Sequence, residues 1–305
     1  MQPGSGGRTR LLPDVPWSGL AGELHMLPSM PPEGHIKIFG VDFSGARDDN
    51  NTWVAEASLE GGELTLDSCR PIRRACLTEL LVDAPAPCIA AMDFPFGLPL
   101  AFAAYWLGSS TSLVDLWEIT AAGGGFEGFL ERRDAFVEQQ GESKRVCDAY
   151  YPESYSSLHR ANPNMLPMTY RGMRMLAALR KAGWAVAPMD SGNRDRAAIE
   201  VMPGATLRAL GLPYKGYKKG RNRFGMRRRI LDGLAKNTRV RVAGQAELLE
   251  TCMTIDDALD AVVAAFTGAL WLAAPDAFRL PSDEERDGAN MEGWMCVPAF
   301  LTPPA

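Results

Sequence analysis

The sequence predicts an α/β fold in which a mixed sheet of five strands is flanked by helices, with a helical insertion after the fourth strand. The first observation is a set of short apolar runs, such as 36–43 and 88–93, that are typical of strands buried on both faces. The second is a pair of longer segments, 170–183 and 254–273, whose apolar residues have helical spacing. Strands and helices mixed in this way predict helices packed on a central sheet.

The first third of the chain is predicted to form three antiparallel strands, a helix and a fourth strand. Gly61 and Gly62 form a turn between the second and third strands, and such short connections join antiparallel neighbours. After the fourth strand, Pro95 and Pro99 take the chain out of the sheet, because proline cannot donate to a ladder of hydrogen bonds. The expected elements lie at 36–43, 52–58, 63–72, 77–82 and 88–93.

The rest of the chain is predicted to place an insertion, at residues 100–168, over one edge of the sheet and then to return to the sheet. Gly183 suits the end of the helix that follows the insertion, since glycine is common just after helices. The expected helices lie at 101–107, 113–122, 129–138, 170–183 and 254–273, a loop at 150–167, and strands or extended segments at 184–189, 197–203 and 292–298.

Composition indicates one domain with a loose tail. Residues 1–33 are rich in Gly, Pro and Ser and are predicted to be disordered, which leaves residues 34–305 as a single domain. Six scattered cysteines and three histidines fit a reduced, cytoplasmic protein and give no zinc site. No apolar run is long enough to span a membrane. The net charge of −5 argues against a generally basic surface, although a local basic patch is compatible with it.

Four aspartates are candidates for a common site at one end of the sheet. Asp42 and Asp93 each lie at the end of an apolar strand, and they would be side by side if these strands are parallel neighbours, because the carboxyl ends of such strands lie about 5 Å apart. Asp257 and Asp260 are three residues apart and so share one face of the last long helix. A buried carboxylate is costly unless it is paired, hydrogen-bonded or bound to a cation. We therefore expect these carboxylates to share a ligand.

Two of the four aspartates also have a purely structural explanation. Asp42 could begin an Asx-turn with the small residues that follow it. Asp257 lies three residues after Thr254 and could complete a capping box at the start of the helix. Asp260 has no such explanation, because it lies in the second turn of a helix made almost entirely of apolar residues.

Converging carboxylates form a hard-oxygen site, for which Mg²⁺ or Mn²⁺ is favoured over zinc. Two such ions about 4 Å apart can hold the attacking and leaving oxygens of a phosphodiester during in-line displacement. We therefore predict that the four aspartates are metal ligands and catalytic residues. Glu200 is either a further catalytic group or the partner of a nearby arginine such as Arg194 or Arg196.

A basic run at residues 214–229 is predicted to contact nucleic acid. It contains eight basic residues, three aromatic residues and no acidic residue. On an acidic protein, this local excess indicates contact with a phosphate backbone and stacking of bases. The alternative is a solvated helix face with a loop. The expected nucleic-acid contacts are Lys215, Lys218, Lys219, Arg221, Arg223, Arg227, Arg228 and Arg229.

Several motifs, together with the order of the elements, resemble a known family. The motifs are GVDFSGA (40–46), AMDFPFGLP (91–99), RVCD (145–148), LRKAGW (179–184), IEVMPGATLRAL (199–210), DDALDAVVAAFTGA (256–269) and EGWMCVP (292–298). They resemble the predicted nucleases called domain of unknown function four-two-nine, which have a ribonuclease H-like fold. In that fold the first strand is central, and the fourth and fifth strands run parallel to it.

The resemblance spans roughly residues 36–300 and implies a nuclease site at the matching aspartates, Asp42, Asp93, Asp257 and Asp260. The pair Asp257 and Asp260 also resembles the last helix of Holliday-junction resolvases of the same fold. Asp93 departs from those resolvases, which commonly have Glu at this place, and its shorter side chain could loosen the metal geometry.

The sequence thus predicts a metal-dependent nuclease, with two alternatives. ATP-dependent phosphotransferases of the actin-like and sugar-kinase type share this fold, and residues 42–45 resemble their first phosphate loop. However, the fourth strand leads into the proline-rich segment 94–99 and not into a second glycine-rich loop. The other alternative is a non-catalytic nucleic-acid-binding or regulatory module, which would bind through the basic run and show no metal-dependent turnover.

Overall fold

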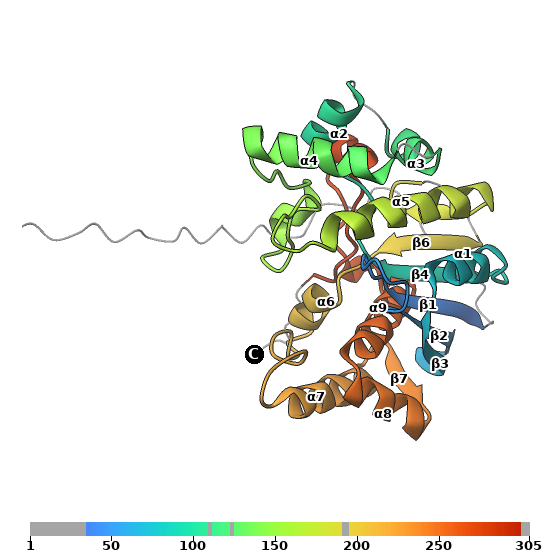
Figure 1. The fold of residues 1–305 in the computed structure, drawn as a ribbon. Coiled ribbons are helices and arrows are strands. Elements are labelled where there is room, and N and C mark those ends of the chain that lie inside the picture. The colour runs from blue at the N-terminus through green and yellow to red at the C-terminus, as the bar shows by residue number, and fades with distance from the viewer. Residues whose placement is uncertain (1–34, 109–111, 123–124, 191–194, 300–305) are drawn as a thin grey trace, which may run out of the picture.

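The structure, a computed structural model, describes residues 35–108, 112–122, 125–190 and 195–299. One mixed sheet of seven strands, in the order β5-β6-β4-β1-β2-β3-β7, is flanked by helices (Figure 1). The predicted α/β class with a single mixed sheet is therefore confirmed, but the expected number of five strands is wrong. The predicted disordered tail, residues 1–33, lies outside the described residues.

The elements have the following bounds. The strands are β1 (Ile36–Asp42), β2 (Thr52–Glu60), β3 (Glu63–Ile72), β4 (Cys88–Asp93), β5 (Ala185–Ala187), β6 (Arg196–Glu200) and β7 (Arg241–Gly244). The α-helices are α1 (Arg74–Val82), α2 (Leu100–Leu107), α3 (Leu113–Ala121), α4 (Phe126–Gln140), α5 (Met165–Lys181), α6 (Pro203–Ala209), α7 (Arg223–Ala235), α8 (Ala246–Thr254), α9 (Asp256–Ala273) and α10 (Arg286–Glu292). Two 3₁₀ turns are η1 (Cys147–Tyr150) and η2 (Pro275–Ala277).

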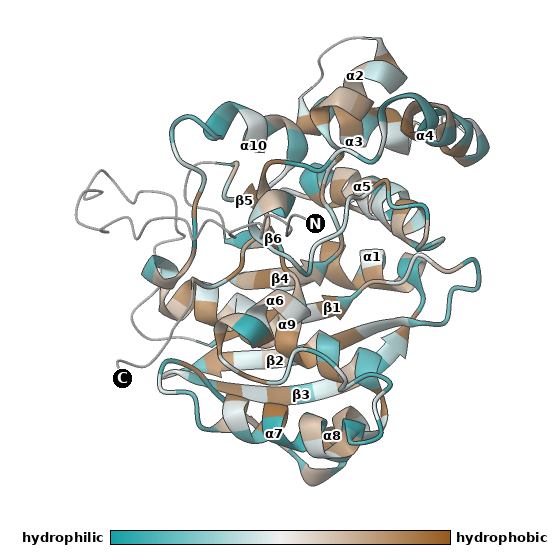
Figure 2. Cartoon of the chain, turned by 90° about the vertical axis from the view of Figure 1, so that its left-hand side faces the viewer, coloured by the Kyte–Doolittle hydropathy of each residue, from teal (hydrophilic) through white to brown (hydrophobic). Residues whose placement is uncertain are grey.

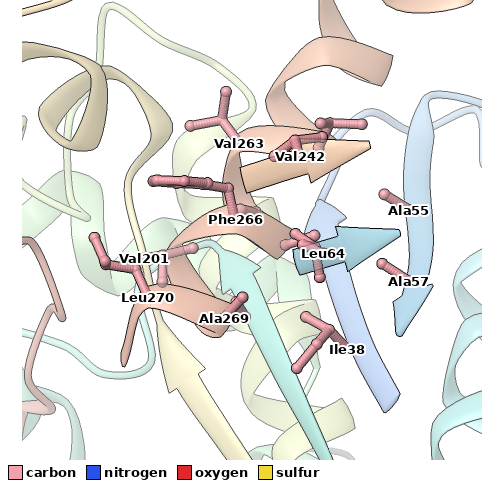
Figure 3. Packing of buried hydrophobic residues seen from close by; sticks show 14 of the residues in the cluster. Ile38, Ala55, Ala57, Leu64, Val201, Val242, Val263, Phe266, Ala269 and Leu270 are labelled. Atoms are coloured by element: carbon pink, nitrogen blue, oxygen red, sulfur yellow. The ribbon is translucent and has the colours of Figure 1, made fainter. Parts of the chain in front are cut away.

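Strand β1 is buried on both faces because its side chains alternate between two cores. Figure 2 shows the hydrophobic character of β1, β4 and α9. Ile38 belongs to the core that α9 covers, together with Phe266 and Ala269 (Figure 3). Phe39 and Val41 belong to the opposite core, beneath α1 and α5. This double burial explains why β1 is a continuous apolar run.

Helix α9 crosses β1 at Gly40 at very short range. A Cβ at this position would lie 2.1 Å from the carbonyl oxygen of Ala261 and 2.2 Å from the amide nitrogen of Ala265. Only glycine permits so close an approach of strand and helix backbones. The contact fixes Asp260, one residue before Ala261, relative to Asp42, two residues after Gly40.

The pairing of β1 with β4 decides where the site lies. The two strands are parallel, and Asp42 lies directly beside Asp93 at their carboxyl ends. On its other edge β1 pairs antiparallel with β2, and β2 pairs antiparallel with β3. The predicted antiparallel meander and the predicted neighbouring aspartates are both present.

The main differences from the predicted elements lie near the basic run and at the start of α5. Helix α5 begins at Met165, within the segment expected to be a loop. Helix α7 begins within the basic run, where a helix was only the alternative interpretation, and β7 and α8, which follow it, were not predicted from the sequence. Strand β7 is parallel to β3, so the sheet is wider than expected. The C-terminal segment docks as expected, because the Cys296 amide donates to the carbonyl of Glu200 at 2.8 Å.

Candidate functional site

Three aspartates from three elements meet at the carboxyl ends of β1 and β4. Asp42 and Asp93 are neighbours in the sheet, and Asp260 lies on the helix that covers the same face. Burial raises the pKa of Asp42 well above its usual range, and the charges of Asp260 and Asp93 raise it further. Burial and the charge of Asp260 raise the pKa of Asp93 to about 7. The three carboxylates, called the carboxylate cluster below, are therefore close enough to repel one another.

Two residues of the basic run, Tyr217 and Lys218, contact the carboxylate cluster. The Tyr217 hydroxyl donates to Asp260 Oδ1 at 2.8 Å, and the Lys218 Nζ lies 2.5 Å from Asp260 Oδ2. The charge of Lys218 also lowers the pKa of Asp42 and Asp93. Burial lowers the pKa of Lys218, but the charges of Asp260 and Asp42 hold it above its usual value. Asp260 thus has partners that its position in the sequence does not reveal.

The carboxylate cluster has more acidic groups than Lys218 can pair with, since three carboxyl groups face one ammonium group. Its donors are all oxygen atoms, which suits Mg²⁺ or Mn²⁺. In the present conformation, the described residues contain no group of three His, Cys, Asp or Glu side chains that is arranged to hold a metal ion. The Lys218 side chain is 48% exposed and has a long flexible stem, so it can withdraw from Asp260. Withdrawal of this ammonium group would leave three carboxyl groups as oxygen ligands for a divalent cation.

Asp257 lies at the edge of the carboxylate cluster, and the capping box predicted for it is wrong. Helix α9 begins at Asp256 and is preceded by Ile255 as its N-cap. Thr254 instead ends α8, and its hydroxyl donates to backbone carbonyls within that helix. Burial and the charge of Asp256 raise the pKa of Asp257, which is partly exposed. The charge of Asp257 in turn raises the pKa of Asp42.

Glu200 is not brought into the carboxylate cluster. Because side chains alternate along a strand, Glu200 lies on the same face of β6 as Ala198, which packs in the core beneath α5 and not in the core beneath α9. Its carboxylate accepts two hydrogen bonds from Arg145, at 2.5 and 2.8 Å. The predicted alternative partner Arg196 instead donates to the carbonyl of Val82. Arg194 lies outside the described residues.

Arg145, which the sequence did not single out, joins the insertion to the sheet. Its guanidinium also donates to both carboxylate oxygens of Asp148 at 3.0 Å, and Arg145, Asp148 and Glu200 are all at most 2% exposed. The amide of Phe96, in the segment that leaves β4, donates to Glu200 at 2.8 Å. The network thus supports the segment that follows Asp93. Its only sequence signal was the RVCD motif at 145–148, in which an arginine and an aspartate are three residues apart.

Arg227 has a structural role, so the prediction that it contacts nucleic acid is wrong. It is 1% exposed and pairs with Asp256 at 3.0 Å. It also donates to the backbone carbonyls of Tyr217, Lys218 and Met253. Arg227 therefore holds the segment that carries Tyr217 and Lys218 against the start of α9.

The other basic residues of the run remain candidates for nucleic-acid contact. The lysines and arginines of the run that are exposed and have no acidic partner among the described residues form a surface that we call the basic patch. Phe224 is 46% exposed, and the guanidinium carbon of Arg223 lies 4.5 Å from the centre of its ring. An exposed aromatic ring among free cations suits base stacking and phosphate contact. The basic patch consists of Lys215, Lys219, Arg221, Arg223, Arg228 and Arg229.

Replacing Arg228 and Arg229 with Gln is expected to weaken nucleic-acid binding equally for all sequences. The slope of log affinity against log salt should fall by about 0.7–0.9 for each phosphate that the variant no longer binds. Fluorescence anisotropy titrations at several salt concentrations measure this slope. Arg227→Gln should instead lower the melting temperature, because it leaves Asp256 without its buried partner. An unchanged slope in the Arg228 and Arg229 variant would make this face of α7 an ordinary solvated surface.

The glycine that suggested a phosphate loop has a packing explanation. A Cβ at Gly45 would lie 2.0 Å from the carbonyl oxygen of Asn164 and 2.7 Å from the amide nitrogen of Met168. The start of α5 therefore covers the backbone of Gly45 on this side, and close packing alone requires glycine there. This contact removes the main observation in favour of a phosphotransferase.

Comparisons with known proteins identify a family and no individual relative. The profile of a family described as protein of unknown function (DUF429) matches residues 40–286, which include the carboxylate cluster, Lys218 and Arg145. No curated protein and no solved structure matches the chain.

Among the described residues, no helix combines the length and the apolar character needed to cross a membrane. All six cysteines are free thiols.

Proposed function

This chain belongs to the DUF429 family of proteins of unknown function, and we propose that it is a metal-dependent nuclease with a ribonuclease H-like fold. The observation that carries the proposal is the convergence of Asp42, Asp93 and Asp260, from two parallel strands and one helix, with only Lys218 to pair with three carboxyl groups. A divalent cation is the ligand that such a group of oxygen donors favours.

The sheet supports the proposed fold. Its five inner strands have the order β6-β4-β1-β2-β3, in which β1 is central. Strand β4 is parallel to β1, and β6 is parallel to β4, whereas β2 is antiparallel to β1. This is the arrangement expected of a ribonuclease H-like sheet. Strands β5 and β7 add one short parallel strand at each edge.

The proposed reaction is hydrolysis of a phosphodiester. Asp42, Asp93 and Asp260 would hold Mg²⁺ or Mn²⁺, with Asp257 at the edge of the site. The bound ions would polarise the phosphate and activate a water molecule. The hydrogen bond from Tyr217 fixes the orientation of Asp260. Once displaced from Asp260, Lys218 presents a positive charge to the substrate phosphate. The basic patch next to Lys218 in the chain binds the nucleic-acid backbone.

Asp42→Asn is the variant that tests this proposal. It should weaken Mn²⁺ binding, measured by calorimetry, by at least about tenfold, because a neutral amide is a poorer ligand for a hard cation. The metal-free variant should melt no lower than the parent, because one of three repelling carboxylates has become neutral. Asp287→Asn is the matched control, since Asp287 is exposed and has no basic partner among the described residues.

Two results would contradict different parts of the proposal. Equal Mn²⁺ affinity in Asp42→Asn and the parent would show that the metal site is wrong. If the parent binds Mn²⁺ at this site but cleaves neither DNA nor RNA, whether single-stranded, duplex or branched, the metal site would stand and the nuclease activity would be rejected. Nucleic-acid binding without turnover is the behaviour of a non-catalytic binding module.

A further inference from the structure

A cavity of about 420 Å³ lies on the other side of the sheet from the carboxylate cluster. Phe43 forms part of its wall, and since Phe43 directly follows Asp42, the cavity and the cluster flank the segment that leaves β1. Its other walls come from α1, α3 and α5. The remaining lining residues are Arg74, Ala75, Thr78, Ala121, Arg171, Arg174 and Met175.

Two of the three arginines in this cavity are held rigidly by the backbone. Arg74 Nη1 donates to the carbonyls of Ser44 and Ala46, both at 3.1 Å. Arg171 Nη1 donates to the carbonyls of Gly45 and Ala46, at 2.6 and 2.9 Å. Each guanidinium therefore has a fixed position, while its Nη2 has no protein acceptor among the described residues.

Positive charge in the cavity is not balanced. Asp49 is the only carboxylate paired with these arginines among the described residues, and its Oδ1 lies 3.3 Å from Arg74 Nε. Arg174 follows Arg171 by three residues on α5, so the two side chains share a face, and Arg174 is exposed. Burial lowers the pKa of Arg171, and the charge of Arg74 lowers it further. Three guanidinium groups thus face one carboxylate.

We infer that this cavity is a binding pocket for a phosphate group. The Nη2 group of each fixed guanidinium can donate a charge-assisted hydrogen bond to a phosphate oxygen, and a guanidinium that is already fixed loses little entropy on binding. The volume lies within the range of small-molecule sites and exceeds that of a lone phosphate, so an attached nucleoside can enter as well. Phe43 and Met175 offer an apolar wall for it. A free mononucleotide and a nucleic-acid strand share this phosphate chemistry.

Arg174→Gln tests the pocket, because this exposed side chain supports no backbone carbonyl in the described structure. The probes are adenosine 5′-monophosphate and a single-stranded oligonucleotide with unphosphorylated ends, both titrated in EDTA. We expect Arg174→Gln to weaken binding of at least one probe by tenfold or more, with an unchanged melting temperature. Arg132→Gln is the matched control, since Arg132 is exposed on α4 and has no acidic partner among the described residues.

The oligonucleotide is titrated in the Arg228→Gln, Arg229→Gln background, so that the basic patch contributes less to binding. An effect on the mononucleotide alone identifies a free nucleotide as the ligand, and an effect on the oligonucleotide identifies a strand phosphate. The inference is overturned if the parent binds neither probe, or if Arg174→Gln binds both as tightly as Arg132→Gln does. Because EDTA removes divalent ions, this result is independent of the proposed nuclease site.

Discussion

Asp260→Asn is expected to reduce Mn²⁺-dependent cleavage by more than about a hundredfold. Replacing residues that only orient a metal ligand already costs about 10- to 100-fold, and Asp260 would be a ligand itself. The amide oxygen can still accept the hydrogen bond from Tyr217, so the fold should survive. Single-turnover cleavage rates at saturating Mn²⁺, together with thermal melts without metal, measure the two effects separately.

Asp257→Asn provides the comparison on the same helix. Asp257 lies at the edge of the carboxylate cluster and caps nothing, so its replacement should cost less activity than that of Asp260. Its effect on stability should be at most about 1 kcal/mol, which is the typical contribution of an acidic side chain near a helix N-terminus. Full activity in Asp260→Asn would reject the proposed mechanism. Equal losses in the two variants would instead place Asp257 among the ligands.

Arg145→Met is expected to lower the free energy of unfolding by about 3–5 kcal/mol, the largest stability effect that we predict. The substitution keeps an apolar stem of similar length but leaves Glu200 and Asp148 buried without their shared partner. Denaturation by urea at pH 7 measures the loss. A cost below about 1 kcal/mol would show that water or another donor replaces the guanidinium.

The decrease in the free energy of unfolding caused by Arg145→Met should be smaller at low pH. Burial raises the pKa of Glu200 even in the parent, although Arg145 lowers it. Without Arg145, the pKa of Glu200 rises further above its value in the unfolded chain. A carboxyl group whose pKa is higher in the folded than in the unfolded state lowers the free energy of unfolding as pH rises above the unfolded-state pKa. Below that pKa the group is protonated in both states and has no such effect. Glu200→Gln added to Arg145→Met should therefore recover part of the stability at pH 7 and little at pH 4.

Local patterns in the sequence located two of the three aspartates at strand ends, and the resemblance to a ribonuclease H-like fold predicted them as neighbours. An apolar run that ends in Asp identifies the carboxyl end of a strand, and parallel pairing then brings Asp42 and Asp93 together. Asp260 could be singled out because a carboxylate within an apolar helix needs a partner. The position of each aspartate thus followed from residues within a single element, whereas the parallel pairing of the two strands was implied by the resemblance.

The partners of these residues could not be predicted because they come from distant segments. Tyr217 is 43 residues from Asp260, and Arg145 is 55 residues from Glu200. In a basic run every arginine has the pattern of a surface residue, and only the folded path of the chain buries Arg227. Strand β7 has four residues, too few to show a period of two, and the three residues of β5 were predicted only as part of a strand or extended segment.

Those two short strands have a consequence for self-association of the protein. Edge strands present unpaired N–H and C=O groups, on which a strand of another molecule can form a ladder and start aggregation. Strands β2 and β3, with nine and ten residues, would be long templates, but β2 lies inside the sheet and β7 pairs with residues 63–66 of β3. The two outermost strands offer only a few ladder positions each, and β7 begins with the exposed Arg241. Among the described residues, strand addition from a second copy is therefore limited to β5, to β7 and to residues 67–72 of β3.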